Sequence, residues 1–432
     1  MNMPDVESIV ESVIRELKAS GVGPGAGASA MRTLGKRGPD VRRSIPSGYQ
    51  VTVLGAGHGG LAMAGHMQLA GCDVRIYSAF RRELAAVIEQ GGVHVEGEEV
   101  SGFAKVRVCQ SLDEAVAGAN LIMIAAPATA HATFATLLAP LLEDGQIVCL
   151  NPGRTGGSLE FGAVLRRFGL SKRIILGETN TFIYAAEMRG PGRTEILHEK
   201  FTMRAAALPA SDNAEFVGAL NYMYPQIEAA ENVLECGFNN VDPVQHLGPM
   251  MLNTAALERS ARDEGNTYQF YQDQMTPTVA ALVMEKIDQD KVSVGRAFGL
   301  SHILSTMDWQ RQHYQVDGKD LFEVLRNNRY YDGFHVGKHI MGYNIVQDGV
   351  GNGCVPMSEF GRLLGLKTPM LDAMTNLACA MTGIDFWTFG RTLERMGLKG
   401  MNKDDILEYV TTQSYLGDCE ASGVCRTLST KR

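Results

Sequence analysis

The stretch from Val51 to Gly60, VTVLGAGHGG, constrains the fold more than any other part of the chain. A short apolar run leads into glycines spaced G-x-G-x-x-G, and an apolar helical pattern follows them. Strand, glycine turn and helix together form a dinucleotide-binding fingerprint, although structural turns without a ligand share this spacing. Gly55 is expected to make the tight turn, Gly57 to let a pyrophosphate approach, and Gly60 to let helix and strand pack closely. His58 lies inside the turn, where the first N–H groups of the helix face the phosphates.

The order of apolar patterns along the chain predicts two kinds of domain. From about residue 50 to 224, strand-like and helix-like segments alternate, which predicts an α/β fold with a doubly wound parallel sheet. Beyond about residue 227, only helical patterns continue, over 244–262, 275–298, 303–314, 320–326, 356–364, 369–382 and 388–396. We therefore expect a dinucleotide-binding (Rossmann) domain over 47–226, an all-helical substrate and catalytic domain over 227–410, and a loose tail over 411–432.

Residues 1–46 are predicted to form an arm rather than part of a core. Residues 4–18 have the spacing of a short amphipathic helix, and the segment after them is rich in glycine and dotted with arginine, which is typical of a flexible linker. Because so short a helix is marginal alone, it must dock somewhere. The simpler interpretation is packing on its own enzyme or on a neighbouring subunit. The alternative is helix-in-groove docking to a shell or core protein, since the arm resembles peptides that carry enzymes into bacterial microcompartments.

The end of the second predicted strand bears on the choice of cofactor. An NAD site usually carries an acidic residue about 20 positions after the glycines, where it binds the ribose. This strand ends at Ser78 without an acid, and Arg81 and Arg82 follow. A serine and two guanidiniums suit a 2′-phosphate, so NADP is favoured, with NAD possible. The alternative is that both arginines merely open a solvated helix.

Two further loops are expected at the carboxyl ends of the sheet, where ligands bind in such folds. They contain Ala126 and Pro127 after one strand, and Asn151 and Pro152 after the next. For each loop taken singly, a simple turn explains the sequence as well as cofactor binding does.

Composition excludes several other classes of protein. The 432 residues carry a formal charge of −8, and no basic run is interleaved with aromatic residues, so we expect no nucleic-acid partner. No apolar run reaches the roughly 18 residues of a membrane span, and no signal peptide is recognisable. The eight cysteines form no C-x-x-C pair and lie beside no histidine at zinc spacing. We expect a soluble cytoplasmic protein with reduced thiols and no metal.

The span from about 51 to 402 resembles the opine dehydrogenases, the family of octopine dehydrogenase and N-(1-carboxyethyl)-norvaline dehydrogenase. The segments that carry this resemblance follow the family order: LGAGHGGLAMAGHM, LNPGRTGGSLEF, GETNTFIYAAEMRGPG, NNVDPVQHLGPMMLN, TYQFYQDQMTPTV and GRTLERMGLKGM. The resemblance implies NAD(P)-dependent reduction of the imine that an amino acid forms with a 2-oxo acid. We also expect a homodimer.

The resemblance implies roles for individual residues. His246 falls on the family's catalytic histidine, although a lone histidine of this kind is more often structural. Asp348 falls near the acid that orients that histidine, in a glycine-rich segment with an extra residue that could equally be a turn. The family's substrate-binding arginine, which precedes this acid, is missing, and the nearest cations are Lys338 and His339. Three further candidates for substrate contact, which could equally be core residues, are Tyr268, Gln269 and Tyr271.

Two other functions remain open at this point. A secondary-alcohol dehydrogenase of the glycerol-phosphate or ketopantoate reductase type shares the glycine fingerprint and a helical second domain. Such enzymes rely on a lysine in the catalytic helix, and none lies near His246 in the sequence. A nucleotide-sensing protein without catalysis is the third possibility, because of the altered 342–353 segment and the arm.

Overall fold

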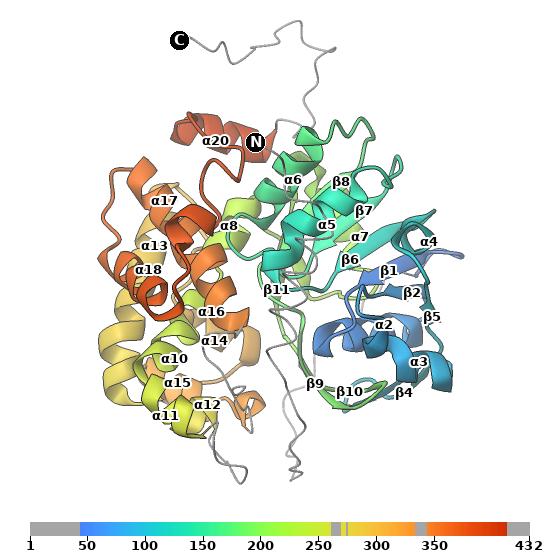
Figure 1. Cartoon of the computed structure of the whole chain (residues 1–432), viewed down its shortest axis with the longest axis horizontal. Helices are drawn as coiled ribbons and strands as arrows, with labels where there is room; N and C mark the ends of the chain where they lie inside the picture. The colour runs from blue at the N-terminus through green and yellow to red at the C-terminus, as the bar shows by residue number, and fades with distance from the viewer. Residues whose placement is uncertain (1–43, 261–268, 274, 333–343, 413–432) are drawn as a thin grey trace, which may run out of the picture.

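The computed structural model describes residues 44–260, 269–273, 275–332 and 344–412 (Figure 1). Several predictions lie outside these ranges: the arm helix at 4–18 with most of its linker, the tail from 413, and the candidate residues Tyr268, Lys338 and His339. Within the described ranges, the chain forms a sheet-containing domain followed by a helical domain, and Figure 1 shows the two side by side.

The first domain is built on a mostly parallel sheet of eight strands in the order β12-β11-β8-β7-β6-β1-β2-β5. Neighbouring strands run parallel except β8 and β11, which pair antiparallel. The order reverses between β1 and β6, and in doubly wound sheets ligands bind at the carboxyl ends of the strands on either side of such a reversal. The predicted fold class is confirmed. The strands are β1 (Gln50–Leu54), β2 (Asp73–Tyr77), β5 (Arg107–Val108), β6 (Leu121–Ile124), β7 (Ile147–Leu150), β8 (Ile175–Thr179), β11 (Met203–Leu208) and β12 (Ile227–Ala229).

A smaller sheet covers the helix that follows the glycine turn. It contains β3 (Val93–Gly97), β4 (Gly102–Ala104), β9 (Tyr184–Gly190) and β10 (Arg193–Glu199), in the order β4-β3-β10-β9. Helix α2 (His58–Leu69) approaches this sheet so closely that a Cβ on Gly65 would lie 2.4 Å from Val95. The segments VHVEG and AKVRV form a hairpin only in part, because β3 pairs with β4 whereas β5 joins the edge of the main sheet.

The other helices of the first domain lie in the predicted segments between strands. Their bounds are η1 (Arg81–Leu84), α3 (Ala85–Gln90), α4 (Leu112–Val116), η2 (Ala128–Ala130), α5 (His131–Leu138), α6 (Gly157–Arg167), η3 (Ala210–Asp212) and α7 (Asn213–Leu220).

The second domain is helical throughout its described residues. Its elements are α8 (Val233–Phe238), α9 (Asp242–Gln245), α10 (Leu247–Leu252), α11 (Thr254–Ser260), α12 (Phe270–Asp273), η4 (Thr278–Met284), α13 (Glu285–Ala297), α14 (Thr306–Tyr314), α15 (Leu321–Asn327), η5 (Arg329–Tyr331), α16 (Asn344–Gly349), η7 (Val350–Cys354), α17 (Val355–Leu363), α18 (Pro369–Thr382), α19 (Phe386–Phe389) and α20 (Lys403–Thr411).

The helix predicted over 244–262 is broken into shorter helices. Pro249 has no N–H to donate to the carbonyl of Gln245, so the ladder of main-chain hydrogen bonds is interrupted next to His246. A second break follows at Asn253, whose side-chain amide donates to the Pro249 carbonyl at 2.8 Å. The first break places His246 at a junction between helices instead of inside one.

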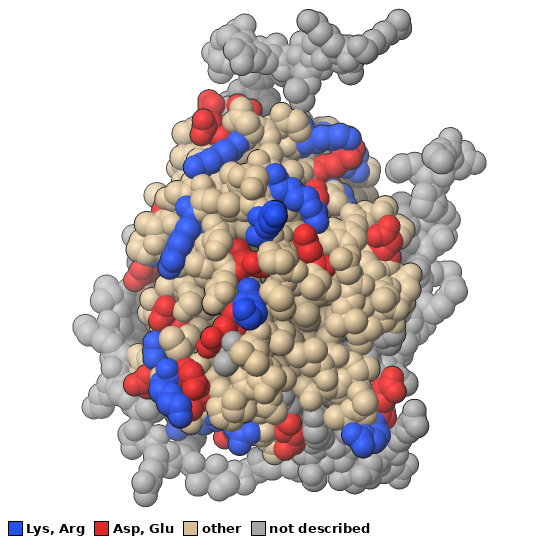
Figure 2. Space-filling view, turned by 90° about the vertical axis from the view of Figure 1, so that its left-hand side faces the viewer, with Lys and Arg blue, Asp and Glu red and all other residues tan. Residues whose placement is uncertain are grey.

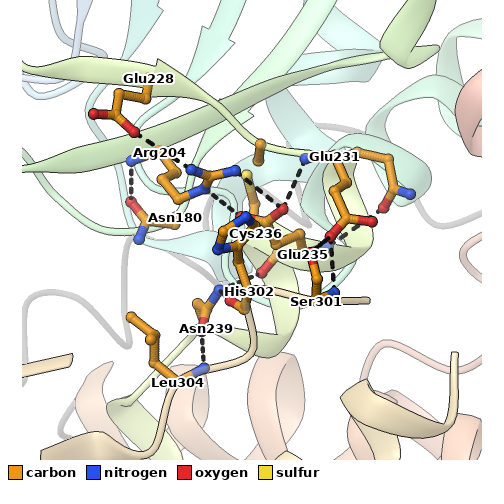
Figure 3. Close-up of polar contacts among 12 residues, drawn as sticks. Asn180, Arg204, Glu228, Glu231, Glu235, Cys236, Asn239, Ser301, His302 and Leu304 are labelled. Atoms are coloured by element: carbon orange, nitrogen blue, oxygen red, sulfur yellow. Dashed lines mark hydrogen bonds and ion pairs between the residues drawn. The ribbon is translucent and has the colours of Figure 1, made fainter. Parts of the chain in front are cut away.

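A buried polar network joins the two domains where the chain passes from one to the other (Figure 3). Glu235, in the first helix of the second domain, has no exposed surface and pairs with Arg204 of β11. Arg204 also accepts at its carbonyl a hydrogen bond of 2.9 Å from the main-chain N–H of Asn180, just after β8. On either side of α8, the side chains of Glu231 and Asn239 accept hydrogen bonds of 2.8 and 2.9 Å from the main-chain N–H groups of Ser301 and Leu304.

The helical domain presents charges of both signs on the face shown in Figure 2. Basic and acidic side chains alternate across it, and uncharged surface separates them. Such a mixture differs from the continuous basic patch that binding to a polyanion requires. Among the described residues, every helix is too short or too polar to cross a bilayer.

Candidate active site

The glycine turn after β1 is shaped by close contacts at two of its glycines. A Cβ on Gly55 would lie 2.3 Å from the carbonyl oxygen of Ala125, and a Cβ on Gly60 would lie 2.0 Å from that of Gly55. A Cβ on Gly57 would meet no atom of the described residues within 4 Å. No described side chain caps the start of α2, so its first N–H groups can face an anion. The turn therefore fits the pyrophosphate of a dinucleotide.

His58 is the first residue of α2 and is oriented by the small sheet. Its Nδ1 accepts a hydrogen bond of 3.3 Å from the main-chain N–H of Met188 in β9. Burial lowers the pKa of His58, against the opposing charge of Glu187, so the ring is neutral near pH 7. A neutral ring at this position adds no positive charge to the turn.

The strand end that we expected to lack an acid has one nearby. Ser78 donates a hydrogen bond of 2.8 Å to Glu83, which η1 carries back to the end of β2. Burial raises the pKa of Glu83, while Ser78 and Arg82 oppose that shift. Arg81 donates to the side chain of Gln110. The serine and both arginines are thus in the predicted region. The hydroxyl of Ser78, however, is already hydrogen-bonded to Glu83, an acid that was not predicted to lie here.

The loop after β6 lies next to the glycine turn, and the loop after β7 follows the neighbouring strand at the same, predicted edge of the sheet. Ala126 and Pro127 follow directly after Ala125, whose carbonyl contacts Gly55. Asn151 is 1% exposed, and among the described residues its side-chain amide has no hydrogen-bond partner. It precedes Pro152 through a cis peptide bond. A buried amide left unpaired in the absence of ligand is a group that a bound cofactor or substrate could satisfy.

His246 faces an acid on its own helical segment. Its Nδ1 lies 3.6 Å from Oδ1 of Asp242, one helical turn earlier, and its Nε2 lies 3.5 Å from the side-chain amide nitrogen of Gln245. The rings of Phe270 and Tyr271 lie 6.2 and 6.3 Å from the imidazole, measured between ring centres. The imidazole is therefore placed between a carboxylate and an aromatic wall, and its Nδ1–H tautomer is favoured.

Arg154 connects this histidine site with the loop after β7. Its guanidinium forms an ion pair with Asp242, and its Nε lies 3.8 Å from Asp348. Its backbone adopts a left-handed conformation with φ of +62°, which directs the side chain across the domain interface. Burial alone would raise the pKa of Asp242, but the charges of Arg154, His246 and Lys200 hold it well below its ordinary value. Asp242 is therefore ionised at neutral pH.

Asp348 does not make the contact with His246 that the resemblance implied. Its carboxylate accepts hydrogen bonds of 3.3 Å from the main-chain N–H groups of Ala128 and Thr129, and one of 3.4 Å from Asn352. Within the described parts of the chain, the acid beside His246 is Asp242. Asp348 instead ties the helical domain to the loop that follows Pro127, and burial raises its pKa against the charge of Arg154.

The segment that carries Asp348 is also not a loop. It forms α16, a π-helical turn (η7) and α17 without interruption. A π turn accommodates one extra residue in a helix, which accounts for the insertion seen in the sequence. Gly349 and Gly353 permit close packing, since a Cβ would lie 3.0 Å from Leu247 at the first and 2.4 Å from Pro243 at the second.

A buried lysine, Lys200, lies at the same interface as Arg154. It follows β10, is 3% exposed, and donates through Nζ to the Phe182 carbonyl at 2.5 Å. The Nζ atom lies 5.3 Å from the centre of the Tyr314 ring. Burial lowers the pKa of Lys200 to about 7, while the charge of Asp242 acts in the opposite direction. Sequence reasoning did not identify this residue.

The predicted substrate contacts that the structure describes lie on the aromatic side of His246. Tyr271 is buried and stacks on Tyr331, with ring centres 4.3 Å apart. Gln310 links Tyr331 to Gln245, donating 2.8 Å hydrogen bonds to both side chains. Gln269 is half-buried beside this wall, and its main-chain N–H donates to Asp273 at 2.5 Å. Tyr271 is thus close to the imidazole, as expected for a substrate-contacting residue.

The loop that carries Arg154 is held from behind by a buried ion pair. Arg391 has no exposed surface and pairs with Glu160 of α6 at 2.8 Å. The same guanidinium donates to the carbonyls of Gly153 and Thr155, on either side of Arg154, at 3.1 and 3.0 Å. The C-terminal part of the helical domain therefore fixes a loop of the cofactor domain.

Some of the missed residues left a signal in the sequence. Asp242 stands one helical turn before His246 in NNVDPVQH, a spacing at which a carboxylate can reach an imidazole. Arg154 lies in NPGRTGGS, directly after Asn151 and Pro152. Lys200 had no such signal, because only the packing of β10 against α14 brings it to the interface.

Residues 229–382 match the family described as NAD/NADP octopine/nopaline dehydrogenase, alpha-helical domain. Residues 50–154 match the N-terminus of NAD-dependent glycerol-3-phosphate dehydrogenase. An opine dehydrogenase of Arthrobacter sp. (strain 1C) is 33% identical over 350 residues, which are 81% of this chain and 95% of that protein. An opine dehydrogenase of Haliotis discus hannai is 22% identical over 320 residues, 67% of this chain and 76% of that protein.

Solved structures with the same fold include an octopine dehydrogenase with NADH and L-arginine. It superimposes with a TM-score of 0.65 at 19% identity, over 83% of this chain and 97% of that one. A yersinopine dehydrogenase with NADP+ gives a TM-score of 0.62 at 14% identity, over 81% of this chain and 97% of that one.

Proposed function

The chain belongs to the opine dehydrogenase family, and from this premise we propose that it reduces the imine formed between an amino acid and a 2-oxo acid, with NADPH as the preferred cofactor. The observation that carries the proposal is the pair of His246 and Asp242, which Arg154 links to the loop after β7 of the cofactor domain. Imine formation releases water, and its reduction gives a secondary amine with two carboxylates.

The proposed chemistry assigns a separate task to each residue of the pair. His246 takes the proton that the substrate ammonium must lose before its nitrogen attacks the carbonyl, and it returns a proton to the departing hydroxyl. Asp242, ionised beside Arg154, holds the Nδ1–H tautomer and stabilises the imidazolium that forms. When bound, the nicotinamide supplies the hydride that reduces the C=N bond. Gly57 and the start of α2 would hold its pyrophosphate.

The preference for NADPH rests on Ser78, Arg81 and Arg82 at the end of β2. A 2′-phosphate there would gain charge-assisted hydrogen bonds, provided that Ser78 leaves Glu83. Glu83 is the group that opposes the preference, because its carboxylate would repel the phosphate and could instead bind a ribose hydroxyl.

The cofactor assignment is tested by the ratio of kcat/KM for NADPH over NADH. The wild type should exceed a ratio of one, Glu83→Gln should increase the ratio, and Ser78→Asp combined with Arg81→Ala should lower it. A wild-type ratio below one would overturn the NADPH preference and leave an NADH enzyme with the same chemistry.

The reaction itself is tested with a matrix of amino acids and 2-oxo acids, followed by NADPH oxidation and mass spectrometry. We expect oxidation only when both substrates are present, with the mass of a secondary amine dicarboxylate as product. Oxidation of NADPH with the carbonyl compound alone would favour the secondary-alcohol dehydrogenase. This alternative is retained because residues 50–154 match the N-terminus of NAD-dependent glycerol-3-phosphate dehydrogenase. Cofactor binding without turnover across the matrix would favour the nucleotide-sensing alternative.

Two assembly properties complete the proposal. The enzyme is a homodimer, which light scattering of the purified chain would test. For the arm at residues 4–18, the proposal is that its apolar stripe packs on the enzyme itself or on a neighbouring subunit, and the supporting feature is the amphipathic pattern. Docking of the stripe to a microcompartment shell or core protein is the competing outcome. The enzyme would act in the cytoplasm or, with a docked arm, inside the compartment.

A further inference from the structure

We propose that Lys200 binds the carboxylate of the 2-oxo acid, the task that the resemblance assigned to an arginine this chain lacks. The inference rests on the proposed function and names a residue for its carbonyl substrate. Three features support it: the position of Lys200, the distribution of charges around it, and the presence of a separate binding site for the cofactor pyrophosphate at the start of α2.

The backbone fixes Lys200 at the meeting point of three parts of the molecule. Its main-chain N–H donates to Ile183 at 3.1 Å, and the next N–H, that of Phe201, donates to His313 of α14 at 3.1 Å. Its Nζ is held by the carbonyl of Phe182, whose ring packs so tightly on the glycine turn that a Cβ on Gly59 would lie 2.2 Å from it. Lys200 therefore lies between the cofactor turn and the helical domain.

Of these two basic side chains at the interface, Arg154 pairs with carboxylates of the described residues and Lys200 does not. Arg154 is shared between Asp242 and Asp348, whereas Lys200 has no carboxylate within ion-pair distance among the described residues. One of the three N–H groups of the Lys200 ammonium donates to the Phe182 carbonyl, and the Tyr314 ring faces the ammonium. A buried ammonium without a counter-ion is unfavourable, and this lowers the pKa of Lys200 to about 7. An incoming carboxylate would supply that counter-ion.

A substrate carboxylate suits this position better than a cofactor phosphate does. The pyrophosphate already has the start of α2 and the open approach at Gly57. Lys200 faces Tyr314, whose ring lies 5.3 Å from that of Tyr331 between ring centres, and Tyr331 stacks on the Tyr271 ring beside His246. An anion bound at Lys200 therefore lies on the histidine side of the interface. A 2-oxo acid held there would lie against the aromatic wall that also contacts the imidazole.

The test measures binding of pyruvate, the simplest 2-oxo acid, and of pyruvamide, its neutral analogue, to the enzyme saturated with NADPH. Lys200→Met should weaken pyruvate binding about 10- to 100-fold, as expected for the loss of a charge-assisted hydrogen bond. It should change pyruvamide binding and the NADPH dissociation constant by less than about threefold. Lys200→Arg should recover part of the affinity. Lys172→Met, which removes an exposed lysine paired at 3.8 Å with Asp144, is the control and should bind like the wild type.

If Lys200→Met does not fold, the wild type alone decides. Only the ammonium form binds a carboxylate, so the affinity ratio of pyruvate to pyruvamide should fall as the pH rises above the pKa of Lys200, and a ratio that is flat from pH 6 to 9 overturns the proposal. The proposal is also overturned if Lys200→Met weakens the binding of pyruvate and pyruvamide equally, or if it weakens only the binding of NADPH. Because these are dissociation constants, they decide the role of Lys200 even if the amine–carbonyl matrix shows no turnover and the proposed reaction fails.

Discussion

At the scale of single residues, the guanidinium of Arg154 governs the electrostatics of the site. It pairs with Asp242 and approaches Asp348, so that two buried acids share one positive charge. Asp242, the acid closer to it, also faces the imidazole and is kept ionised, whereas burial raises the pKa of Asp348. Two acids in one cluster are thereby given different tasks: one supports the histidine and the other joins the domains.

This division predicts an order of severity among substitutions. His246→Ala should lower kcat by about 10²- to 10⁴-fold, the usual range for loss of a general acid–base, with NADPH affinity nearly unchanged. Asp242→Asn should come next, because the amide keeps the shape but not the charge that stabilises an imidazolium. Asp348→Asn should cost less, since it keeps an acceptor for Ala128 and Thr129. Steady-state kinetics and NADPH titration give the order, and a larger loss in Asp348→Asn than in Asp242→Asn would restore the role that the resemblance implied.

Glu178 provides a prediction for the dependence of stability on pH. It is fully buried, its Oε2 accepts two hydrogen bonds of 2.6 Å from Ser158, and burial raises its pKa from 4.5 to about 7. The native state therefore holds a proton that the unfolded state has lost, and the stabilisation this provides disappears as the pH rises from about 4.5 to about 7.

Glu178→Gln removes that titration and keeps an acceptor for Ser158. The stability of the variant relative to the wild type should rise between pH 5 and pH 8, by on the order of 3 kcal/mol for a shift of this size. Urea denaturation at both pH values measures the difference, and contributions from other groups cancel in the comparison. A difference that does not change with pH would show that Glu178 stays ionised in the native protein.

The residues of the site were predictable to different degrees. Gly55, Gly57 and Gly60 follow from local spacing, and the structure shows the close contacts that require two of them. His246 follows from the resemblance, because nothing in its immediate neighbours marks it as reactive. Glu83 and Lys200 could not be predicted, since a turn of η1 brings the first back to β2 and contacts between sheet and helix place the second.

At the scale of elements, proline and glycine account for the differences between expected and observed helices. A continuous helix was expected over 244–262, and Pro249 divides it beside His246. A turn was one alternative for the glycine-rich segment around Asp348, and a helix with a π turn is found, in which Gly349 and Gly353 contact α10 and α9. Hydrophobic periodicity predicts that helices exist, but not how closely two of them approach.

The ion pair of Arg391 and Glu160 predicts how strongly the two domains are coupled. Arg391→Met leaves Glu160 buried with only Arg395, whose side chain is 41% exposed, so it should lower the free energy of unfolding by about 3–5 kcal/mol. The double variant Glu160→Gln/Arg391→Met should recover part of that loss, because no unpaired charge remains buried. Arg395→Ala, the control, should have a small effect.

Denaturation curves of these variants, together with kcat, test whether the pair acts on the site. Arg391 also holds the carbonyls on either side of Arg154, so its loss should lower kcat even where the protein remains folded. Wild-type kcat in a folded Arg391→Met variant would show that the loop keeps its shape without this contact.

At the scale of the whole molecule, the boundary of the N-terminal arm can be set from packing. Ile45 and Tyr49 pack against the core of the first domain, and Tyr49 contacts the ring of Tyr222 with 5.2 Å between centres. Residues before 47 therefore contribute to the core of the first domain, which continues to β12.

Deleting residues 1–43 should leave kcat, melting temperature and oligomeric state unchanged, because the packed residues remain. Deleting 1–49 is the matched variant, and the loss of Ile45 and Tyr49 should destabilise the protein. If the arm docks to a compartment protein, residues 1–20 fused to a fluorescent protein should become punctate in cells that make microcompartments. A diffuse fusion, together with a 1–43 deletion that disturbs the oligomer, would identify the arm as a structural part of the enzyme.

The hydrogen bond from Arg391 to the Gly153 carbonyl determines when, during synthesis of the chain, the active site can form. These residues are separated by 238 positions, so the loop that carries Arg154 has left the ribosome long before the side chain that holds it is synthesised. Domains generally fold in the order in which they emerge, and contacts between distant positions form late. The growing chain should therefore acquire its dinucleotide-binding half first and its proton-transfer geometry last. A polypeptide that stalls shortly before Arg391 would sequester cofactor without turning it over.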